Sequence, residues 1–372
     1  MNHRDKLLKL RAFSAFLFMC FYGQAHAQQR FLIEGLLTGE LYDTSGDSLL
    51  LSRNDDDLST VGRLQLWSAY QLSDNFQVYA LVELETENAS GSYDSEAELE
   101  QLAIRYTRPE APYIVVEAGR ILGPISVFAD WHLSDRNPLI GELDTHPTTY
   151  PEGIQVSGSQ AKFDYRVAYI DQPDFYADED ELAPDSAFRP VFGVGYTPFF
   201  GLRLGASYTD GPFLSRFYND SLPEGVSWRD FDQRVVGMDF QYSHEYLELN
   251  AEWSRKKYQL PFLAPDLEET NYFVELKYTF TPRFYAAARL QVLDRTLIGT
   301  SAPEFTTAIN RRLEDVEIGL GYRVSPDLLL KASYRSQHWR SPDNMVNGLR
   351  DGHSLAFQIS WTLDPRSWRQ HD

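Results

Sequence analysis

Residues 272–292 read YFVELKYTFTPRFYAAARLQV, and this stretch decides the fold. On each side of the central Thr-Pro-Arg, large apolar residues alternate with polar or small ones. Alternation with a period of two places the apolar side chains on one face of a strand. Thr and Pro favour the backbone angles of a tight reversal, so the stretch predicts two antiparallel strands joined by a short turn.

A unit of this kind occurs four times along the chain: a tyrosine, five residues that suit a turn, and then another large apolar residue. Tyrosine can bury its ring and keep its hydroxyl hydrated, which suits the boundary between a membrane and water. The repetition therefore indicates one boundary that the chain meets several times. The units are Tyr70-QLSDN-Phe76, Tyr196-TPFFG-Leu202, Tyr278-TFTPR-Phe284 and Tyr322-RVSPD-Leu328.

About sixteen segments with alternating apolar residues follow one another between Phe31 and Leu363, each near the roughly ten residues that cross a bilayer at a tilt. We predict an all-β fold, a transmembrane antiparallel up-and-down β-barrel with short periplasmic turns and long extracellular loops. A water-soluble β-sandwich is the alternative, but it would not predict that short and long connections alternate. The predicted long loops are 43–59, 87–97, 120–152, 172–189, 211–231, 257–269, 295–312 and 340–351.

The first 27 residues have the features of an export signal. Basic residues between Arg4 and Arg11 precede an apolar run, and Ala25-His26-Ala27 supplies small residues for cleavage. We therefore expect a signal peptide at residues 1–27 and an outer-membrane β-barrel at residues 28–372, which places the protein in the bacterial outer membrane. Cys20 is then an ordinary signal-peptide residue, and the mature chain contains no cysteine.

The chain is strongly acidic. Removal of residues 1–27 takes away four basic residues and one acidic residue, so the net charge falls from −20 to −23. Nucleic acid is excluded as a partner, because phosphate binding needs clustered Lys and Arg. The acidic runs at 45–59 and 171–185 are either simply solvated or form a negative mouth that attracts cations. Divalent cations could also bridge them to lipopolysaccharide, but the spacing indicates no metal site, and we predict no metal and no cofactor.

A barrel of this width leaves a water-filled channel, so its function depends on the residues that face the lumen. The positions between the outward apolar residues carry acids and bases in nearly equal numbers. This balance predicts passive diffusion of small hydrophilic solutes or ions, and the acidic loops add a modest cation preference. The predicted pore-wall residues are Arg63, Glu83, Arg105, Arg166, Arg203, Glu248, Glu252, Glu275, Lys277, Arg289, Arg323, Lys331 and Arg335.

The predicted loop 120–152 is unusual, because an exposed loop rarely contains so many apolar residues. Ile125, Trp131 and Leu139 are among them. If the loop folds into the barrel, these residues are buried against the wall and the pore becomes narrower. The alternative is an outward loop that packs on a neighbouring subunit. For the inward fold, the predicted constriction residues are Asp130, Asp135, Arg136, Glu142 and Asp144.

Three local sequences and the overall layout resemble the bacterial outer-membrane porin superfamily, in particular porins similar to the phosphate-selective O/P group. The sequences are Tyr113-IVVEAGR-Ile121, the GPISVFADW that follows, and Asn137-PLIGE. The resemblance implies passive diffusion, commonly through homotrimers. Two features differ from the family pattern: DPRSWRQHD follows the last strand, and the wall lacks the rich Arg and Lys ladders of anion-selective members. An anion-selective or phosphate-selective porin is therefore the alternative function.

Catalysis is a further class to consider, because some outer-membrane barrels are proteases or phospholipases. The conceivable partial sites are His132 with Asp130 or Asp135, and His338 with Ser336. Residues of these types often occur close together by chance, so we predict that the protein is not an enzyme. The acidic loops also permit a surface adhesin or a scaffold barrel without transport.

Overall fold

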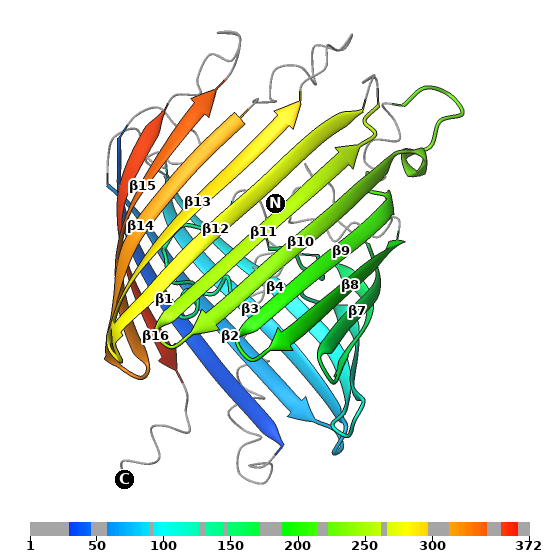
Figure 1. Cartoon of the computed structure of the whole chain (residues 1–372), viewed down its shortest axis with the longest axis horizontal. Coiled ribbons are helices and arrows are strands. Elements are labelled where there is room, and N and C mark those ends of the chain that lie inside the picture. The colour runs from blue at the N-terminus through cyan, green and yellow to red at the C-terminus, as the bar shows by residue number, and fades with distance from the viewer. Residues whose placement is uncertain are drawn as a thin grey trace.

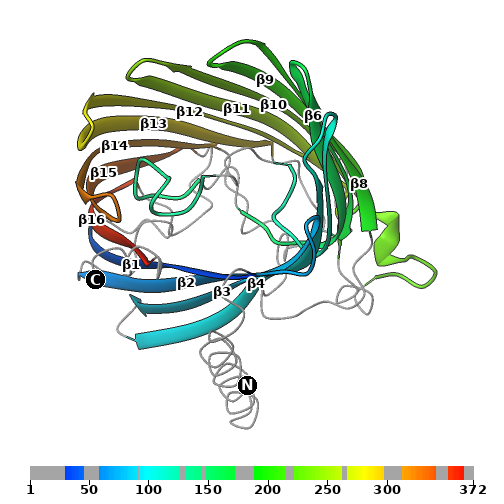
Figure 2. The same ribbon diagram turned by 90° about the horizontal axis from the view of Figure 1, so that it is seen from below.

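The computed structural model describes residues 30–45, 58–89, 92–125, 131–143, 148–171, 188–214, 222–261, 266–296, 312–340 and 351–363. They form a closed barrel of sixteen antiparallel strands (Figure 1). Each strand pairs with its neighbours in the chain, and β1 pairs with β16, so the strands form a ring (Figure 2). The prediction of an all-β antiparallel barrel with sixteen strands is confirmed. The predicted signal peptide, residues 1–27, lies outside the described residues.

The strands are eight to seventeen residues long and run side by side with a common tilt (Figure 1). A short 3-10 helix, η4, covers Trp228–Asp230. In the described ranges no helix is long and apolar enough to cross a membrane. The strands are β1 Phe31–Ser45, β2 Ser59–Gln71, β3 Phe76–Ala89, β4 Ser92–Arg108, β5 Tyr113–Arg120, β6 Glu152–Gln160, β7 Phe163–Asp171, β8 Phe188–Phe199, β9 Leu202–Pro212, β10 Asp232–His244, β11 Leu247–Tyr258, β12 Leu267–Thr281, β13 Phe284–Thr296, β14 Arg312–Ser325, β15 Leu328–Arg340 and β16 Gly352–Leu363.

Pairing between the first and last strands closes the barrel. The β1–β16 register runs from Gly35 opposite Leu363 to Ser45 opposite His353. The other edge of β1 pairs with β2. An open edge strand would present unpaired N–H and C=O groups, and closure removes that edge. The closed ladder thereby meets the requirement that backbone polar groups in lipid be satisfied within the protein.

The outer face of the barrel is apolar, whereas the inner face is largely polar. On β12, Val274, Leu276 and Tyr278 point outward and are 41–43% exposed, while Glu275 between them is 1% exposed. This arrangement is the reverse of a water-soluble protein. A continuous band of exposed apolar side chains is unfavourable in water and suits contact with lipid.

The four tyrosine units form short connections: β2 to β3, β8 to β9, β12 to β13, and β14 to β15. Their tyrosines are 38–45% exposed on the outer face. Aromatic neighbours on adjacent strands meet in the same region. The ring centroids of Phe76 and Tyr106 are 5.0 Å apart, and those of Phe163 and Tyr196 are 4.9 Å apart. Aromatic residues therefore gather outside the barrel at its short-turn end.

The predicted long loop at residues 87–97 is wrong. β3 and β4 continue through this segment and pair as far as Ala89 and Ser92. The register shifts between Leu81 and Val82, where β4 contains a bulge. A bulge changes which residues of a strand face outward. The apolar alternation is therefore interrupted, and the polar residues beyond the bulge resemble a loop in the sequence.

Candidate functional site in the barrel lumen

The described parts of loop 120–152 lie within the ring of strands (Figure 2). The two arms of the loop are joined by backbone hydrogen bonds. The N–H of Ile121 donates to the carbonyl of Pro151 at 2.9 Å, and the N–H of Gly123 donates to that of Thr149 at 2.7 Å. The loop thus leaves β5 and returns to β6 as a paired stem.

Apolar residues of the loop are buried against the inner wall. Leu139 packs on Tyr285, Ala287 and Leu329 from β13 and β15. Ile121 joins an apolar cluster on the opposite wall, and both Leu139 and Ile121 are only 1% exposed. Burial of this apolar surface stabilises the loop against the wall. The wall residues around Ile121 are Tyr79, Ala103, Ala168, Ile170 and Val191.

Four charged strand residues hold the turn 137–141, and we call them the loop anchor: Glu275 on β12, Arg289 on β13, Glu317 on β14 and Lys331 on β15. Glu275 acts indirectly, since its carboxylate binds the Arg289 guanidinium at 2.5 Å. The other three contact the loop itself. The anchor therefore spans four adjacent strands of the wall.

Acidic and basic side chains of the loop anchor both form hydrogen bonds with the backbone of the loop. Glu317 Oε1 accepts the N–H of Gly141 at 3.0 Å, and Arg289 Nη1 donates to the carbonyl of Gly141 at 2.6 Å. Lys331 Nζ donates to the carbonyl of Leu139 at 2.8 Å. Hydrogen bonds to ionised groups are about twice as strong as those between neutral groups. The turn is consequently fixed to the wall by polar contacts as well as by packing.

The loop anchor is shielded from water. Glu275 is 1%, Arg289 2%, Glu317 3% and Lys331 4% exposed. Buried ions are unfavourable unless opposite charges and hydrogen bonds compensate them, and both are present here. Three predicted pore-wall residues, Glu275, Arg289 and Lys331, therefore lie beneath the loop.

Further contacts attach the loop to β1 and β16. The hydroxyls of Thr38 and Ser134 are 2.6 Å apart, and Ser360 Oγ donates to the carbonyl of Ser134 at 3.2 Å. Tyr285 OH donates to the carbonyl of Pro138 at 3.2 Å. The loop thus covers the inner wall formed by β13 to β16 and β1.

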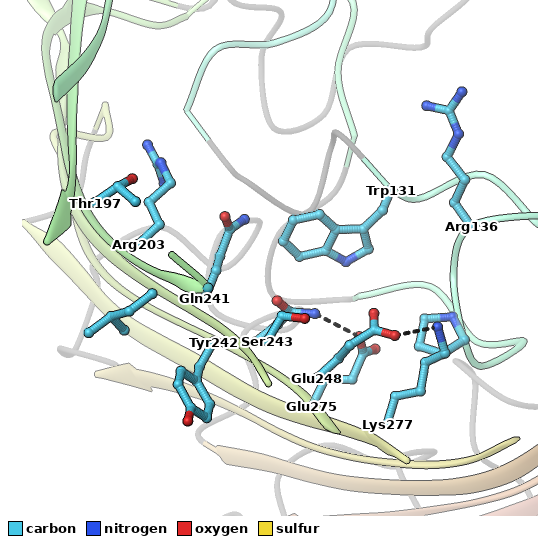
Figure 3. Close-up of a pocket in the computed structure, with 14 residues that line it drawn as sticks. Trp131, Arg136, Thr197, Arg203, Gln241, Tyr242, Ser243, Glu248, Glu275 and Lys277 are labelled. Carbon is cyan, nitrogen blue, oxygen red and sulfur yellow. Dashed lines mark hydrogen bonds and ion pairs between the residues drawn. The ribbon is translucent and has the colours of Figure 1, made fainter. Parts of the chain in front are cut away.

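On the other side of the loop, the described residues line two chambers. The tyrosine chamber, of about 520 Å³, is defined by Trp67, Tyr79, Arg105, Tyr113, Tyr150 and Arg166. The amide chamber, of about 450 Å³, is defined by Trp131, Arg203, Gln241, Glu248, Asn250 and Lys277 (Figure 3). A cavity of about 300 Å³ adjoins both, because it shares Arg166 with the first and Arg203 with the second.

Arg136, from the loop, borders both the tyrosine chamber and the amide chamber. Its guanidinium points away from Glu248 and Glu275 in Figure 3. In the part of the chain that the structure describes, Arg136 is exposed and contacts no carboxylate. It is thus a cation open to solvent at the boundary between the chambers.

Most predicted wall residues around the open lumen form ion pairs. Arg105 Nη2 is 2.8 Å from Glu117 Oε1, and Lys277 Nζ is 2.8 Å from Glu248 Oε1. Arg63 Nη2 is 2.5 Å from Glu85 Oε2. The pairing explains how the wall holds many charges of both signs, because each charge is compensated locally.

Arg203 joins two acids from different strands. Its Nη2 is 2.7 Å from Asp164 Oδ1 on β7, and it also pairs with Asp239 on β10. Gly195 and Gly205 leave room for this bridge, since a Cβ at Gly195 would lie 2.2 Å from an Asp164 oxygen and one at Gly205 would lie 2.0 Å from an Asp239 oxygen. The local sequence therefore combines an arginine with two glycines to form the bridge.

The remaining predicted wall residues have other surroundings. Glu83 is 3.2 Å from Arg63, and Glu252 is buried. Arg323 donates to the carbonyl of Pro326 at 3.0 Å beside a short turn. The side chain of Arg335 pairs with the buried Asp315, which also accepts hydrogen bonds from Gln291 and Gln337.

The predicted constriction residues are not joined by direct contacts in the described part of the loop. Asp130 and Asp144 lie outside the described residues. Asp135 is half-buried, Arg136 is exposed, and the Glu142 side chain is 65% exposed, with one oxygen 3.6 Å from Arg63. Asp135, Arg136 and Glu142 therefore differ in their exposure to solvent and in their neighbours.

Sequence reasoning missed the tyrosines of the lumen. Tyr79 lies between Val78 and Ala80, which face outward. Because successive side chains of a strand point to opposite faces, the sequence does indicate that Tyr79 faces inward. No comparable signal marks Tyr150, whose hydroxyl is 3.1 Å from His132 Nε2. Burial, with a smaller contribution from nearby carboxylates, raises the pKa of the Tyr150 hydroxyl, so it stays protonated at neutral pH.

The histidines of the conceivable catalytic pairs have other partners. His132 contacts Tyr150, and His338 Nδ1 is 2.5 Å from Asp351 on the exposed surface. Across the described ranges, no group of three or more His, Cys, Asp or Glu residues could hold a metal ion.

No protein-family model and no curated protein matches the chain. Solved structures of bacterial porins match its fold over nearly the whole chain. The outer-membrane channel DcaP of Acinetobacter baumannii gives a TM-score of 0.62 at 11% sequence identity, covering 90% of this chain and 97% of that one. The fold is that of outer-membrane porins.

Two further porin structures are similar to the same extent. Salmonella typhi OmpF, in a complex with daunomycin, gives a TM-score of 0.59 at 11% identity, with 90% of this chain and 97% of that chain covered. The anion-selective porin from Comamonas acidovorans gives 0.57 at 11% identity, with 90% and 99% covered. Identity at this level shows a shared fold and no more. A sixteen-stranded barrel of this fold is consistent with the bacterial outer membrane.

Proposed function

We propose that the protein is a porin-like channel of the bacterial outer membrane through which small hydrophilic solutes diffuse passively. The observation that carries the proposal is the position of loop 120–152: the loop anchor fixes it to one side of the lumen, and the two chambers remain open on the other side. The exposed apolar side chains of the outer face support the proposal that the barrel is embedded in a lipid bilayer.

In this proposal the loop narrows the pore. The packing of Leu139 and the anchor contacts at Gly141 support it, because they keep the loop from swinging out of the barrel. Asp135, Arg136 and Glu142 then supply charges at the narrow part, together with Asp130 and Asp144 from the same loop. The charges of the wall are compensated by their ion-pair partners. The exposed charged groups of the loop therefore have the larger influence on which ions pass.

Two ion preferences are candidates. The acidic chain, with its net charge of −20, supports a modest cation preference, since a negative mouth concentrates cations. The exposed Arg136 at the boundary between the chambers supports the alternative, a preference for anions. The fold shared with an anion-selective porin is compatible with that alternative. Lipopolysaccharide and two further copies of this chain are the proposed neighbours in the membrane.

Planar-bilayer recording of the purified, folded protein tests the proposal. We expect discrete conductance steps in potassium chloride, and the reversal potential in a salt gradient gives the sign of ion selectivity. Conductance steps with cation preference support the first candidate, and anion preference supports the second. Folded protein that inserts into the bilayer but produces no steps would instead support an adhesin or a scaffold barrel.

A further inference from the structure

The amide chamber presents an aromatic ring to a space that fits a small solute. Trp131, from the loop, is half-buried: it packs on Leu143 and Phe273 and also borders the chamber. Figure 3 shows its indole projecting from the loop, and the side chains of Gln241 and Glu248 extending from the strands. The chamber measures about 450 Å³, within the roughly 300–1,000 Å³ that is typical of small-molecule pockets.

Two rows of polar side chains cross β10, β11 and β12 at this chamber, and we call them the polar grid. Direct partners in a strand register have Cβ atoms about 4.5–5.5 Å apart. The side chains of one row therefore lie side by side, at a spacing comparable to the width of a pyranose ring. The first row is Gln241, Asn250 and Glu275, and the second row is Ser243, Glu248 and Lys277.

Several groups of the polar grid remain available for hydrogen bonds. The side-chain amide of Gln241 has no partner among the described residues. Asn250 Nδ2 donates to Glu275 Oε1 at 3.5 Å, so the amide oxygen of Asn250 stays an acceptor. Glu248 Oε1 accepts from Lys277, and the Glu248 side chain is still 44% exposed. The grid thus offers both donors and acceptors, which is what hydroxyl groups require.

The charges of the polar grid are compensated locally. Lys277 Nζ and Glu248 Oε1 are 2.8 Å apart and form one ion pair. Glu275 is 1% exposed and belongs to the loop anchor, which contains two acids and two bases. Neither group of charges has an excess of one sign. The grid therefore acts mainly as a surface of hydrogen-bonding groups.

Two arginines border the chamber beside the grid, and their charges also have counterparts. Arg203 binds two acids, Asp164 and Asp239, and Arg166 acts on the second of them as well. Arg136 is exposed and contacts no carboxylate among the described residues. A charged solute would lose part of its hydration here without meeting a strong opposite charge. An uncharged solute does not bear that cost.

We propose that the amide chamber is a binding subsite for a neutral monosaccharide in its pyranose form. The polar grid exchanges hydrogen bonds with the sugar hydroxyls. Trp131 packs against a C–H face of the sugar ring, since the face of an aromatic ring carries partial negative charge and attracts C–H groups. The inference rests on the proposed channel function, because the sugar reaches the chamber through the lumen.

Glucose is the probe for this subsite, and two solutes serve as matched controls. Sorbitol carries its hydroxyl groups on an open chain without a ring, and glucuronate has the ring with a carboxylate added. Calorimetry on the folded, detergent-solubilised protein should show glucose binding at least about tenfold more tightly than sorbitol. Glucuronate should bind no more tightly than glucose. Equal affinity for glucose and sorbitol would overturn the proposal, and so would a preference for glucuronate, which would indicate an anion site.

Two pairs of variants locate the subsite, each checked for folding by circular dichroism. Trp131→Ala should weaken glucose binding at least about tenfold. Trp67→Ala removes a ring from the tyrosine chamber and should leave the affinity unchanged. Equal losses in the two variants would refute the assignment.

The second pair tests the polar grid without disturbing the loop. Gln241→Leu keeps the size of the side chain and removes an amide that contacts no other described residue, so the fold should be retained. Glucose binding should again weaken at least about tenfold. Gln101→Leu makes the same change in the tyrosine chamber and should have no effect. A Gln241→Leu variant that binds glucose as well as Gln101→Leu does would contradict the proposed role of the grid.

The two proposals fail separately. Folded protein that binds glucose in preference to sorbitol but shows no conductance steps would remove the channel function and retain the subsite. A protein that conducts ions but binds glucose no better than sorbitol would retain the channel and remove the subsite.

Discussion

Glu317 on β14 accepts the backbone N–H of Gly141 at 3.0 Å, although 176 positions separate the two residues in the chain. The same carboxylate oxygen accepts the N–H of Ile140 at 3.1 Å. Glu317 is buried, so these bonds form away from competing water. This contact connects the wall of the barrel directly to the turn 137–141 of loop 120–152.

Glu317→Ala should release the loop. The change removes the acceptor of both N–H groups and leaves the buried cations of the loop anchor with less negative charge. Loss of one partner from a buried charged group costs about 3–5 kcal/mol. We expect a lower free energy of unfolding in urea and a larger, noisier single-channel conductance.

Glu314→Ala is the matched control for that variant. Glu314 lies on the same strand and pairs with Arg340 at 3.0 Å near the exposed surface. Exposed ion pairs contribute about 0–1 kcal/mol. The control should therefore change neither conductance nor stability strongly, and equal effects of both variants would argue against the anchor.

Gly141→Ala tests the close approach on the loop side of the same contact. A Cβ at position 141 would lie 2.7 Å from Glu317 Oε2 and 3.0 Å from Arg335 Nη1, so neighbouring atoms must move. Overpacking of this kind costs about 1–3 kcal/mol. We expect reduced thermal stability and a changed conductance. Gly193→Ala is the control, because its new Cβ would be 3.6 Å from the nearest atom, at an ordinary contact distance.

The alternation of residues along each strand predicted the barrel, because every second residue is apolar and faces outward. Leu276, Tyr278 and Phe280 repeat this pattern and are exposed on the outer face. This alternation is a local property of each strand. A single bulge in β4, opposite Leu81 and Val82, interrupts it, and the polar stretch beyond that bulge resembled a loop.

The contacts between the loop anchor and the loop could not be predicted from this alternation. Lys331 Nζ donates to the carbonyl of Asn137 at 2.9 Å, although the two residues are 194 positions apart in the chain. The alternation along β15 indicates only that Lys331 faces inward. Whether an inward charge meets water or a loop depends on where that loop packs. The sequence identified the apolar residues of loop 120–152, but it contained no pattern that pairs Asn137 with Lys331.

Arg203→Ala should make the channel more selective for cations. Arg203 pairs with Asp164 and Asp239, and its removal leaves two carboxylates facing the lumen without that partner. Negative charge close to the path of ions concentrates cations and repels anions. The reversal potential in a potassium chloride gradient should shift accordingly. Arg203→Lys keeps the positive charge and should shift it much less, so equal shifts would contradict the electrostatic explanation.

Ile318→Arg tests whether the outer face contacts lipid. Ile318 is 53% exposed on β14, and its neighbours in the register are Ala288 and Tyr334. A charged side chain on the lipid face of a barrel costs about 2–4 kcal/mol at the middle of the bilayer and about 0–1 kcal/mol near its surface. We expect that loss in the free energy of folding into lipid vesicles, measured by urea titration.

The control is Ser336→Arg, an exposed position four residues from the end of β15. It should cost much less than Ile318→Arg because it lies closer to the long-loop end of the barrel. Similar losses for the two variants would mean that the apolar band does not contact the bilayer core. A loss confined to Ile318→Arg would place the middle of β14 in the bilayer, which the proposed channel requires.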